Sequence, residues 1–386
     1  MGIKTLTLNN YSKFLPWKIS SNEMLPNILL MSKILFLLLV LNRFYFKIND
    51  PHIPFIRLLD VFNNYPNVFK YSLRFGFILF GFMLLFNIKT RLSSLFLGLI
   101  IIITFLASKP LFRNHVFIVG SVLFLVGISN NKTVLKLLIL QLSIVYLGAS
   151  INKMFEIDWW SGQFMDNWLS TAENNPIYIY ISALLPTLVF AKILSWSAII
   201  VEFIIGILLL IKKWRLFGVW LLIIFHFTMF TMVHDKFGHF LQGLFIVLIA
   251  FIPWPQNKVQ VKFNPGKYKN LIFFNKLLDW DGIVNWKKNK ANKNNWLEVN
   301  YKNKITTNID GLKSLLIYSS GFYIVLLGID FFENHLLTLT TNSSLKMLIH
   351  LLFCLLMWYL IFAFLPYKLK RKNGKLTLLK ESYELI

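Results

Sequence analysis

Long apolar runs separated by short polar segments dominate the chain, and their lengths are the first guide to its fold. A helix needs about 20 predominantly apolar residues to cross the hydrocarbon core of a bilayer. Ten runs approach or reach this length: Leu25–Tyr45, Tyr71–Ile88, Leu92–Ala107, His115–Ile128, Val134–Ile151, Leu188–Ile211, Leu216–Val233, Phe240–Pro253, Leu312–Asp330 and Leu345–Leu365. The runs at 115–128 and 240–253 are short, so they either span with tilt or local thinning or are re-entrant. The pattern predicts an all-α polytopic membrane protein with about ten transmembrane helices.

One polar stretch interrupts this pattern before the last two apolar runs. Residues 256–310 are rich in Asn and Lys. Within them, VQVKF and WLEVNY are strand-like, whereas NLIFFNKLLDW is helix-like. We therefore expect a small cytoplasmic α/β-like insert before the last two helices. The predicted organisation is a cytoplasmic tail at 1–24, a transmembrane domain of about eight helices at 25–255, a basic cytoplasmic segment at 256–311, two C-terminal transmembrane helices at 312–366 and a basic cytoplasmic tail at 367–386.

The composition argues against a soluble or disordered chain. Hydrophobic residues make up 56% of the sequence and charged residues 15%, against about a quarter charged in a typical soluble domain. So few polar residues do not cover a soluble protein's surface, and the aromatic content of 17% is too high for a disordered chain. A lipid bilayer is the expected environment. The single cysteine, Cys354, excludes an intrachain disulfide and a CxxC redox motif.

The net charge is +23, and the distribution of the basic residues along the chain agrees with the predicted topology. If the N-terminus is inside and all ten runs span, 28 of the 40 lysines and arginines lie on one side, whereas the opposite loop at 156–175 has four acidic residues and no basic one. Because short cytoplasmic loops are enriched in lysine and arginine, we expect both termini in the cytoplasm. Topology and attraction to anionic lipid account for the scattered lysines, so no nucleic-acid partner is expected.

Four ionisable residues within or beside the apolar runs are candidate site residues, because such groups are costly in a bilayer. Lys153 closes the fifth run, where it either extends to the interface or supplies a partly desolvated amine that acts as a base. Glu202 lies midway through the sixth run and either makes a structural pair with His226 or a lysine or contributes to a binding site. His226, in the seventh run, either makes an interhelical hydrogen bond or binds a ligand. His115 opens the fourth run.

Two tryptophans and an acidic residue follow the fifth run directly. Asp158, Trp159 and Trp160 lie a few residues beyond Lys153. Tryptophans at this position are typical of an interfacial belt. Beside a lysine and a carboxylate, they are equally suited to form the mouth of an apolar pocket.

Three histidines near the seventh run invite interpretation as a metal site. His226, His234 and His239 are spaced by eight and five residues. Only the first two lie roughly on one helical face, two turns apart, which is too far for shared ligation. We therefore expect no metal site.

The segment IVYLGASINKMFEIDWWSGQFM, which begins at Ile144, resembles the horizontally transferred transmembrane (HTTM) domain family. That family is similar to the membrane part of vitamin K-dependent gamma-carboxylase. The resemblance extends over roughly residues 25–255 and strengthens the expectation of a helical membrane domain. The positions that match the carboxylase pattern are Lys153-Met154, Asp158-Trp159, Gly162, Phe225-His226 and Asn114-His115.

This resemblance implies quinone chemistry at the membrane boundary. The carboxylase lysine that matches Lys153 deprotonates vitamin K hydroquinone, and the histidine that matches His115 is implicated in the same chemistry. The large extracytoplasmic part that handles the carboxylase's peptide has no counterpart here. We therefore expect binding or oxidation of a lipophilic quinone or hydroquinone rather than peptide carboxylation. The residues expected to bind the substrate are Asp158, Trp159, Trp160, Glu202 and His226.

Other functions remain open. A toxin-maturation protein of bacterial operons is similar to this family, which implies a bacterial cytoplasmic membrane and, as an alternative, a non-catalytic factor that assists maturation or export of a partner protein or toxin. A transporter is less expected, because no inverted repeat is recognisable. The insert, around Leu278-Asp279-Trp280, faintly resembles a thioredoxin-like module of the DCC type, but it lacks both cysteines that disulfide exchange requires.

Overall fold

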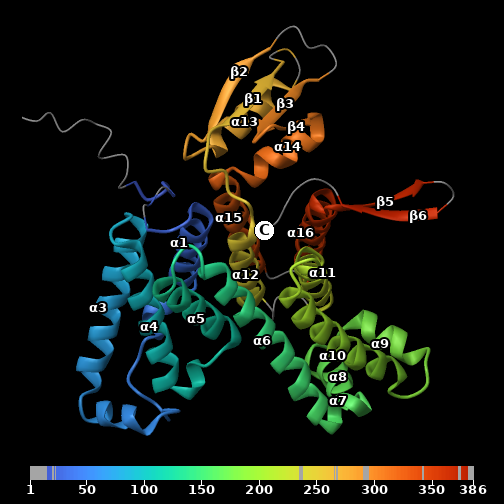
Figure 1. Ribbon diagram of the computed structural model, residues 1–386. Coiled ribbons are helices and arrows are strands. Elements are labelled where there is room, and N and C mark those ends of the chain that lie inside the picture. Colours follow the sequence, from blue (N-terminus) through green and yellow to red (C-terminus); the bar gives the residue numbers. More distant parts are fainter. Residues whose placement is uncertain are drawn as a thin grey trace, which may run out of the picture.

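Helices form most of the protein, and a small sheet stands at one end of the helical body (Figure 1). The computed structural model describes residues 15–19, 21, 23–233, 238–264, 266, 268–289, 295–340, 343–372 and 375–380. The α-helices are α1 (Pro26–Leu41), α2 (Phe44–Lys47), α3 (Pro66–Leu85), α4 (Thr90–Ala107), α5 (Asn114–Ile128), α6 (Val134–Phe155), α7 (Ile157–Ser161), α8 (Gln163–Asp166), α9 (Pro176–Ala183), α10 (Val189–Leu210), α11 (Arg215–Val233), α12 (Gly238–Leu248), α13 (Lys269–Leu278), α14 (Asn308–Ile317), α15 (Ser320–Leu339) and α16 (Ser343–Phe364). Tighter 3-10 segments cover Arg57–Asn64, Lys109–Leu111 and Ile249–Phe251, and Asn167–Ala172 is a π-helical segment. The strands are β1 (Val259–Phe263), β2 (Val284–Lys288), β3 (Leu297–Tyr301), β4 (Lys304–Thr307), β5 (Tyr367–Lys372) and β6 (Lys375–Lys380).

Seven helices in the described part of the chain are long and apolar enough to cross a membrane, namely α3, α4, α6, α10, α11, α15 and α16. The remaining three predicted runs form shorter apolar helices: α1, α5, and α12 with its 3-10 continuation to Phe251. A polytopic helical membrane protein is therefore confirmed, whereas the count of about ten spanning helices is not. Helix α1 is short because Arg43 adopts a left-handed conformation, with φ of 54°, just after the helix ends.

Helix α1 lies within the core of the helical body. Its residues Leu29, Met31 and Leu35 are fully buried, in an apolar cluster to which α3, α4, α5, α6, α10, α11 and α12 also contribute. The side chain of Asn27 joins α1 to the end of α12, because its Nδ2 donates to the carbonyl of Ala250 at 2.6 Å. From this core, α6 runs toward α7, α8 and α10, away from the sheet (Figure 1).

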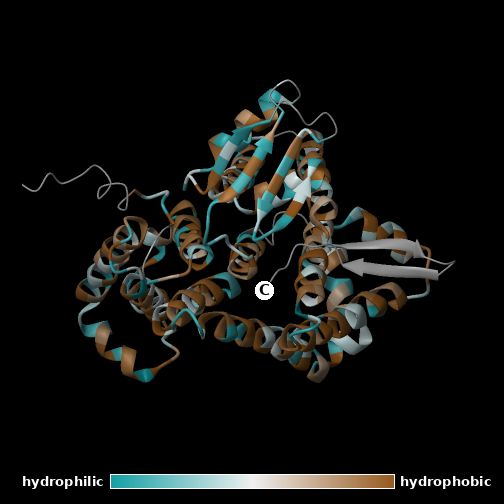
Figure 2. Cartoon of the chain, turned by 45° about the horizontal axis from the view of Figure 1, so that its top comes forward, coloured by the Kyte–Doolittle hydropathy of each residue, from teal (hydrophilic) through white to brown (hydrophobic). Residues whose placement is uncertain are grey.

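The polar insert between α12 and α15 folds as a small α/β unit. Its sheet has the order β2-β1-β3-β4; β1 and β2 are parallel, and the other two pairs are antiparallel. Val261 of β1 is paired with Trp286 on one side and with Val299 on the other. The segments VQVKF and WLEVNY contain β1 and β3, and NLIFFNKLLDW contains most of α13, as predicted. The strands carry more hydrophilic positions than the helices of the body do (Figure 2).

The chain returns from this unit into α15 and α16 and ends in an antiparallel hairpin of β5 and β6. The α/β unit therefore precedes the last two long helices, as the sequence predicts. The cytoplasmic assignments, the domain boundaries and the DCC-type interpretation of the insert remain predictions. Most of the N-terminal tail and residues 381–386 lie outside the described residues.

Candidate functional site

The candidate site lies where α6 and α10 pack closely together. Small residues permit this approach. Ser150 of α6 is fully buried and donates from its Oγ to the backbone carbonyl of Ile199 in α10 at 2.8 Å. A Cβ on Gly206 of α10 would lie 2.6 Å from the Cγ of Leu147. The absence of a side chain at Gly206 therefore allows the two helices to approach each other.

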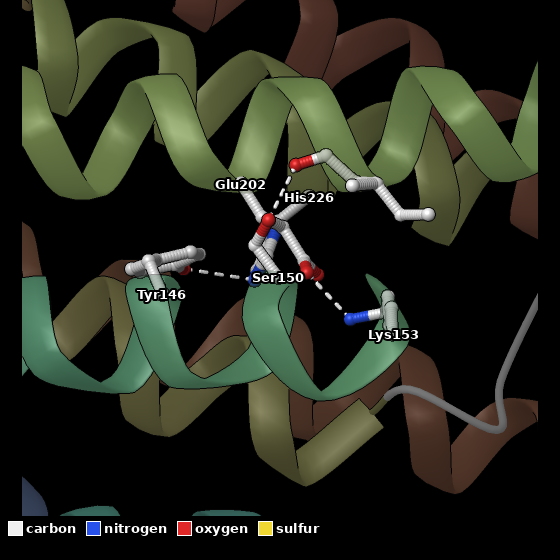
Figure 3. A network of polar contacts seen from close by, with 6 residues as sticks. Tyr146, Ser150, Lys153, Glu202 and His226 are labelled. Atoms are coloured by element: carbon white, nitrogen blue, oxygen red, sulfur yellow. Dashed lines mark hydrogen bonds and ion pairs between the residues drawn. The ribbon is translucent and has the colours of Figure 1, made fainter. Parts of the chain in front are cut away.

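An ion pair crosses this interface. The Nζ of Lys153 lies 2.5 Å from the Oε2 of Glu202 (Figure 3). Their side chains are 18% and 10% exposed, respectively. Because each charge supplies the other's counter-charge in surroundings that water hardly enters, the pair is held together strongly, and either charge would be costly alone. Glu202 therefore pairs with a lysine, which is one of the roles predicted for it.

The direction of the lysine side chain is set by its helix. Lys153 lies two residues before the end of α6, and side chains of an α-helix lean toward the helix N-terminus. Glu202 is 13 residues into α10, about 20 Å along the helix axis. The ammonium therefore points back along the membrane-spanning segment to its partner rather than outward from the end of α6. This direction differs from the alternative in which Lys153 extends to the interface.

Aromatic residues of the following turn cover the outer side of this pair. The Lys153 Nζ lies 5.0 Å from the ring centroid of Trp159 in α7, within the range of a cation–π interaction. The rings of Trp160 and Trp196 lie 6.1 Å apart, and both side chains are nearly half exposed. Asp158 is exposed, and no ion pair between it and Lys153 occurs in the described part of the chain. Trp159 therefore belongs to the site, whereas Asp158 is exposed and makes no ion pair with Lys153 in the described residues.

A glycine positions this aromatic turn against α10. Gly162 separates α7 from α8 and has a φ of 83°, which side-chain-bearing residues rarely adopt. A Cβ there would lie 2.7 Å from the backbone nitrogen of Lys192 in α10. Both the conformation and the space thus require glycine, which accounts for the matched Gly of the sequence motif in structural terms.

A second polar contact lies deeper along the same face of α6. The hydroxyl of Tyr146 is 2.9 Å from the Nε2 of His226, and both residues are 3% exposed (Figure 3). The histidine ring also lies against Phe225 and Phe240, with centroids 5.1 and 5.4 Å away. His226 therefore makes the interhelical hydrogen bond that is one of its two predicted roles, and its Nδ1 has no hydrogen-bond partner among the described residues.

His115 stands apart from this network. It lies in the first turn of α5, with its ring 5.9 Å from that of His239 near the start of α12. The Nδ1 of His239 is in turn 3.1 Å from the Oε1 of Gln242. In the described residues, His115 makes no contact with Lys153, and no three metal-ligating side chains come together. His234 lies outside those residues.

Sequence reasoning did not select Tyr146 and Ser150 as site residues. Together with Lys153 they occupy positions i, i+4 and i+7 of α6, which share one face of a helix. That spacing is a signal that the sequence contains. It is weak alone, because Tyr146 and Ser150 are ordinary residues of an apolar helix until their partners on α10 and α11 are known.

The fold and the site define a polytopic α-helical membrane protein that holds a lysine–glutamate ion pair between two of its helices. Residues 131–240 match the family model of the HTTM domain. This match supports assignment of the protein to the HTTM family, and the matched segment, from just before α6 into α12, contains Tyr146, Ser150, Lys153, Glu202 and His226. No curated protein and no solved structure matches the chain significantly.

Proposed function

We propose that the protein binds a lipophilic quinol beside Lys153 and takes a proton from it. The observation that carries this proposal is the placement of the ammonium, which is paired with Glu202 inside a membrane-spanning interface while 18% of the lysine side chain stays exposed. An ionisable group that is largely desolvated and still reachable is suited to exchange a proton with a molecule dissolved in the bilayer.

The residues around the lysine fit a flat aromatic ligand. The ring of Trp159 lies beside the ammonium, and the exposed rings of Trp160 and Trp196 offer further apolar surface at the same boundary. The buried Nδ1 of His226 is a polar atom still without a partner in the described residues. A quinol would supply an acidic hydroxyl and an aromatic ring, which match a basic amine beside indole rings.

The ion pair offers a way to accept the proton. Lys153 and Glu202 share one ionisable proton, either as ammonium and carboxylate or as amine and carboxylic acid. In the second form, the nitrogen of Lys153 has a lone pair that can take the hydroxyl proton of the quinol. The products are a quinolate anion and a Lys153 ammonium beside a protonated Glu202, so that the negative charge of the ligand is balanced by the site.

The test uses the detergent-purified protein and menadiol, a methylated naphthohydroquinone, without oxygen. Absorbance of the hydroquinonate, recorded against pH, reports where bound menadiol ionises. We expect the wild type to ionise menadiol at a lower pH than detergent alone does. We expect Lys153→Arg to lose this effect, because arginine does not release its proton.

Lys70 supplies a matched control. Its side chain is also 18% exposed and is paired with Asp50 at 2.9 Å, but on α3 rather than at the site. Lys70→Arg should therefore leave the ionisation of menadiol unchanged. The proposal fails if the wild type and Lys153→Arg ionise menadiol alike, or if neither binds it.

A second candidate is a non-catalytic factor that assists maturation or export of a partner protein. The ion pair itself favours it, because Lys153 joined to Glu202 at 2.5 Å acts as a clamp between α6 and α10. For a clamp, arginine serves nearly as well as lysine. Under this candidate, Lys153→Arg therefore retains partner maturation in cells, whereas Lys153→Ala loses it together with stability.

A further inference from the structure

A large cavity lies between the helices and the α/β unit. Its volume is about 630 Å³, within the range of roughly 300–1,000 Å³ of small-molecule sites. It is bounded by α11, α12, α15 and α16, and on its remaining side by the β3–β4 hairpin and α14 of the α/β unit. Neither Lys153 nor Glu202 lines it. The ion pair of the proposed quinol site therefore does not contribute to this cavity.

The cavity is elongated along the helices. On α15 its lining runs from Phe322 to Asp330, and on α16 from Phe353 to Phe364. These separations of eight and eleven residues correspond to about 12 and 16 Å along the helix axes. The walls are mostly apolar, with Phe227 and Phe230 contributed by α11. Two polar residues, Gln242 and Asp330, also line the cavity and hydrogen-bond to each other. Its dimensions and lining suit a hydrocarbon chain.

Aromatic side chains with polar groups mark the end of the cavity next to the α/β unit. The ring centroids of Tyr301 and Tyr318 are 5.6 Å apart, and those of Tyr323 and Trp254 are 6.2 Å apart. The hydroxyl of Tyr323 donates to the carbonyl of Ile317 at 3.0 Å. Tyrosine and tryptophan gather at the level of lipid headgroups because one end of each is apolar and the other polar. This end of the cavity is therefore placed at a membrane–water boundary.

Two lysines line the cavity at this same end. Lys302 and Lys304 belong to the tight β3–β4 turn, where Lys302 and Asn303 have φ of 49° and 63°. Neither lysine has an ion-pair partner in the described part of the chain, although two other lysines of the unit do pair with acids. The turn thus presents positive charge, without a protein counter-charge, directly above an apolar cavity.

We propose that this cavity binds one anionic phospholipid of the bilayer, with its phosphate near Lys302 and Lys304 and an acyl chain between the helices. The positive end selects the headgroup charge, and the apolar walls of α11, α15 and α16 hold the chain. Bound in this way, the lipid joins the α/β unit to the helices on either side of the cavity.

The test compares lipid retention by native mass spectrometry after purification into detergent and addition of phosphatidylglycerol or phosphatidylcholine. We expect the wild type to retain phosphatidylglycerol in preference to phosphatidylcholine. The double variant Lys302→Gln/Lys304→Gln should bind phosphatidylglycerol about 30-fold more weakly, which corresponds to about 1 kcal/mol for each lysine. Its binding of phosphatidylcholine should not change.

The matched control removes the same charge elsewhere on the α/β unit. Lys287 and Lys288, in β2, are exposed and do not line the cavity. The variant Lys287→Gln/Lys288→Gln should therefore retain phosphatidylglycerol as the wild type does. The inference is overturned if this control loses the lipid equally, which would indicate a general charge effect. It is also overturned if phosphatidylcholine is retained as well as phosphatidylglycerol, which would indicate unselective filling by bilayer lipid.

Discussion

A double-mutant cycle measures the coupling energy between Lys153 and Glu202, the ion pair that joins α6 and α10. Glu202→Gln leaves the ammonium of Lys153 without a counter-charge in a site where its side chain is only 18% exposed. Removal of one partner of a buried pair costs about 3–5 kcal/mol of unfolding free energy. Because the lysine side chain is not fully buried, we expect about 3 kcal/mol, the lower end of this range.

The single variant Lys153→Met and the double variant should lose less stability than Glu202→Gln does. Lys153→Met leaves a carboxylate that can become neutral by taking up a proton, so its loss of stability should be smaller than that of Glu202→Gln. The double variant contains no buried charge, and replacement of a whole buried pair by neutral groups is often nearly neutral. The sum of the two single losses minus the loss of the double variant gives an expected coupling energy of at least about 3 kcal/mol between Lys153 and Glu202.

The assay is reversible unfolding in mixed detergent micelles, followed by circular dichroism for the four proteins of the cycle. The pair between Lys70 and Asp50 provides the matched cycle, because its lysine is equally exposed at 18% while its aspartate is 52% exposed. For that pair we expect about 0–1 kcal/mol. A coupling at Lys153 and Glu202 no larger than at the control pair would refute the reasoning that burial between two helices makes this pair strong.

Three further substitutions test the surroundings of the site and the α/β unit. Gly206→Ala should destabilise the protein, because its Cβ would collide with a leucine of α6. Gly148→Ala is the control: its Cβ meets no atom within 4 Å, so the variant should be neutral or more stable by up to about 1 kcal/mol. Thermal unfolding in detergent compares the two variants directly. Tyr146→Phe removes the partner of the buried Nε2 of His226 and should cost about 1–3 kcal/mol, measured in the same unfolding assay, with an unchanged stability as the contrary result. The carboxylate of Asp279 accepts hydrogen bonds from the backbone N–H groups of Ile283 and Val284 at 2.9 and 3.1 Å. In Asp279→Asn one of these groups should lose its acceptor, so the amide protons at the start of β2 should exchange faster with deuterium. Equal exchange in the variant and the wild type would contradict this expectation.

Much of the architecture could be predicted because it depends on local properties of the chain. A run such as 198–211 is apolar at every position except Glu202. The length of such a run decides whether a helix can cross a bilayer, whatever its neighbours are. The strand-like pattern of VQVKF likewise reports the alternation of buried and exposed faces in β1. The count of spanning helices was less predictable. The predicted run at 25–45 is interrupted at Arg43, which has a left-handed conformation, and the run at 115–128 is too short for its length alone to decide whether it spans.

The candidate site was likewise predictable only in part. Lys153 was recognisable from its place at the end of an apolar run and from the motif around it, and Glu202 and His226 from the rarity of ionisable residues in such runs. Their pairing was not recognisable. Lys153 and Glu202 are 49 residues apart in the sequence, and Tyr146 and His226 are 80 apart, so their partners depend on which helices pack together.

The sequence by itself thus indicated a helical membrane protein, with a segment at 131–240 that matches the HTTM domain model and a conspicuous lysine at the end of one helix. Only the tertiary structure decided that the lysine points inward to Glu202, that His115 belongs to a different contact, and that Lys302 and Lys304 line a largely apolar cavity. The physical reason is that hydrophobicity and helix length are properties of a segment, whereas the partner of a buried charge and the shape of a cavity arise only where separate segments meet.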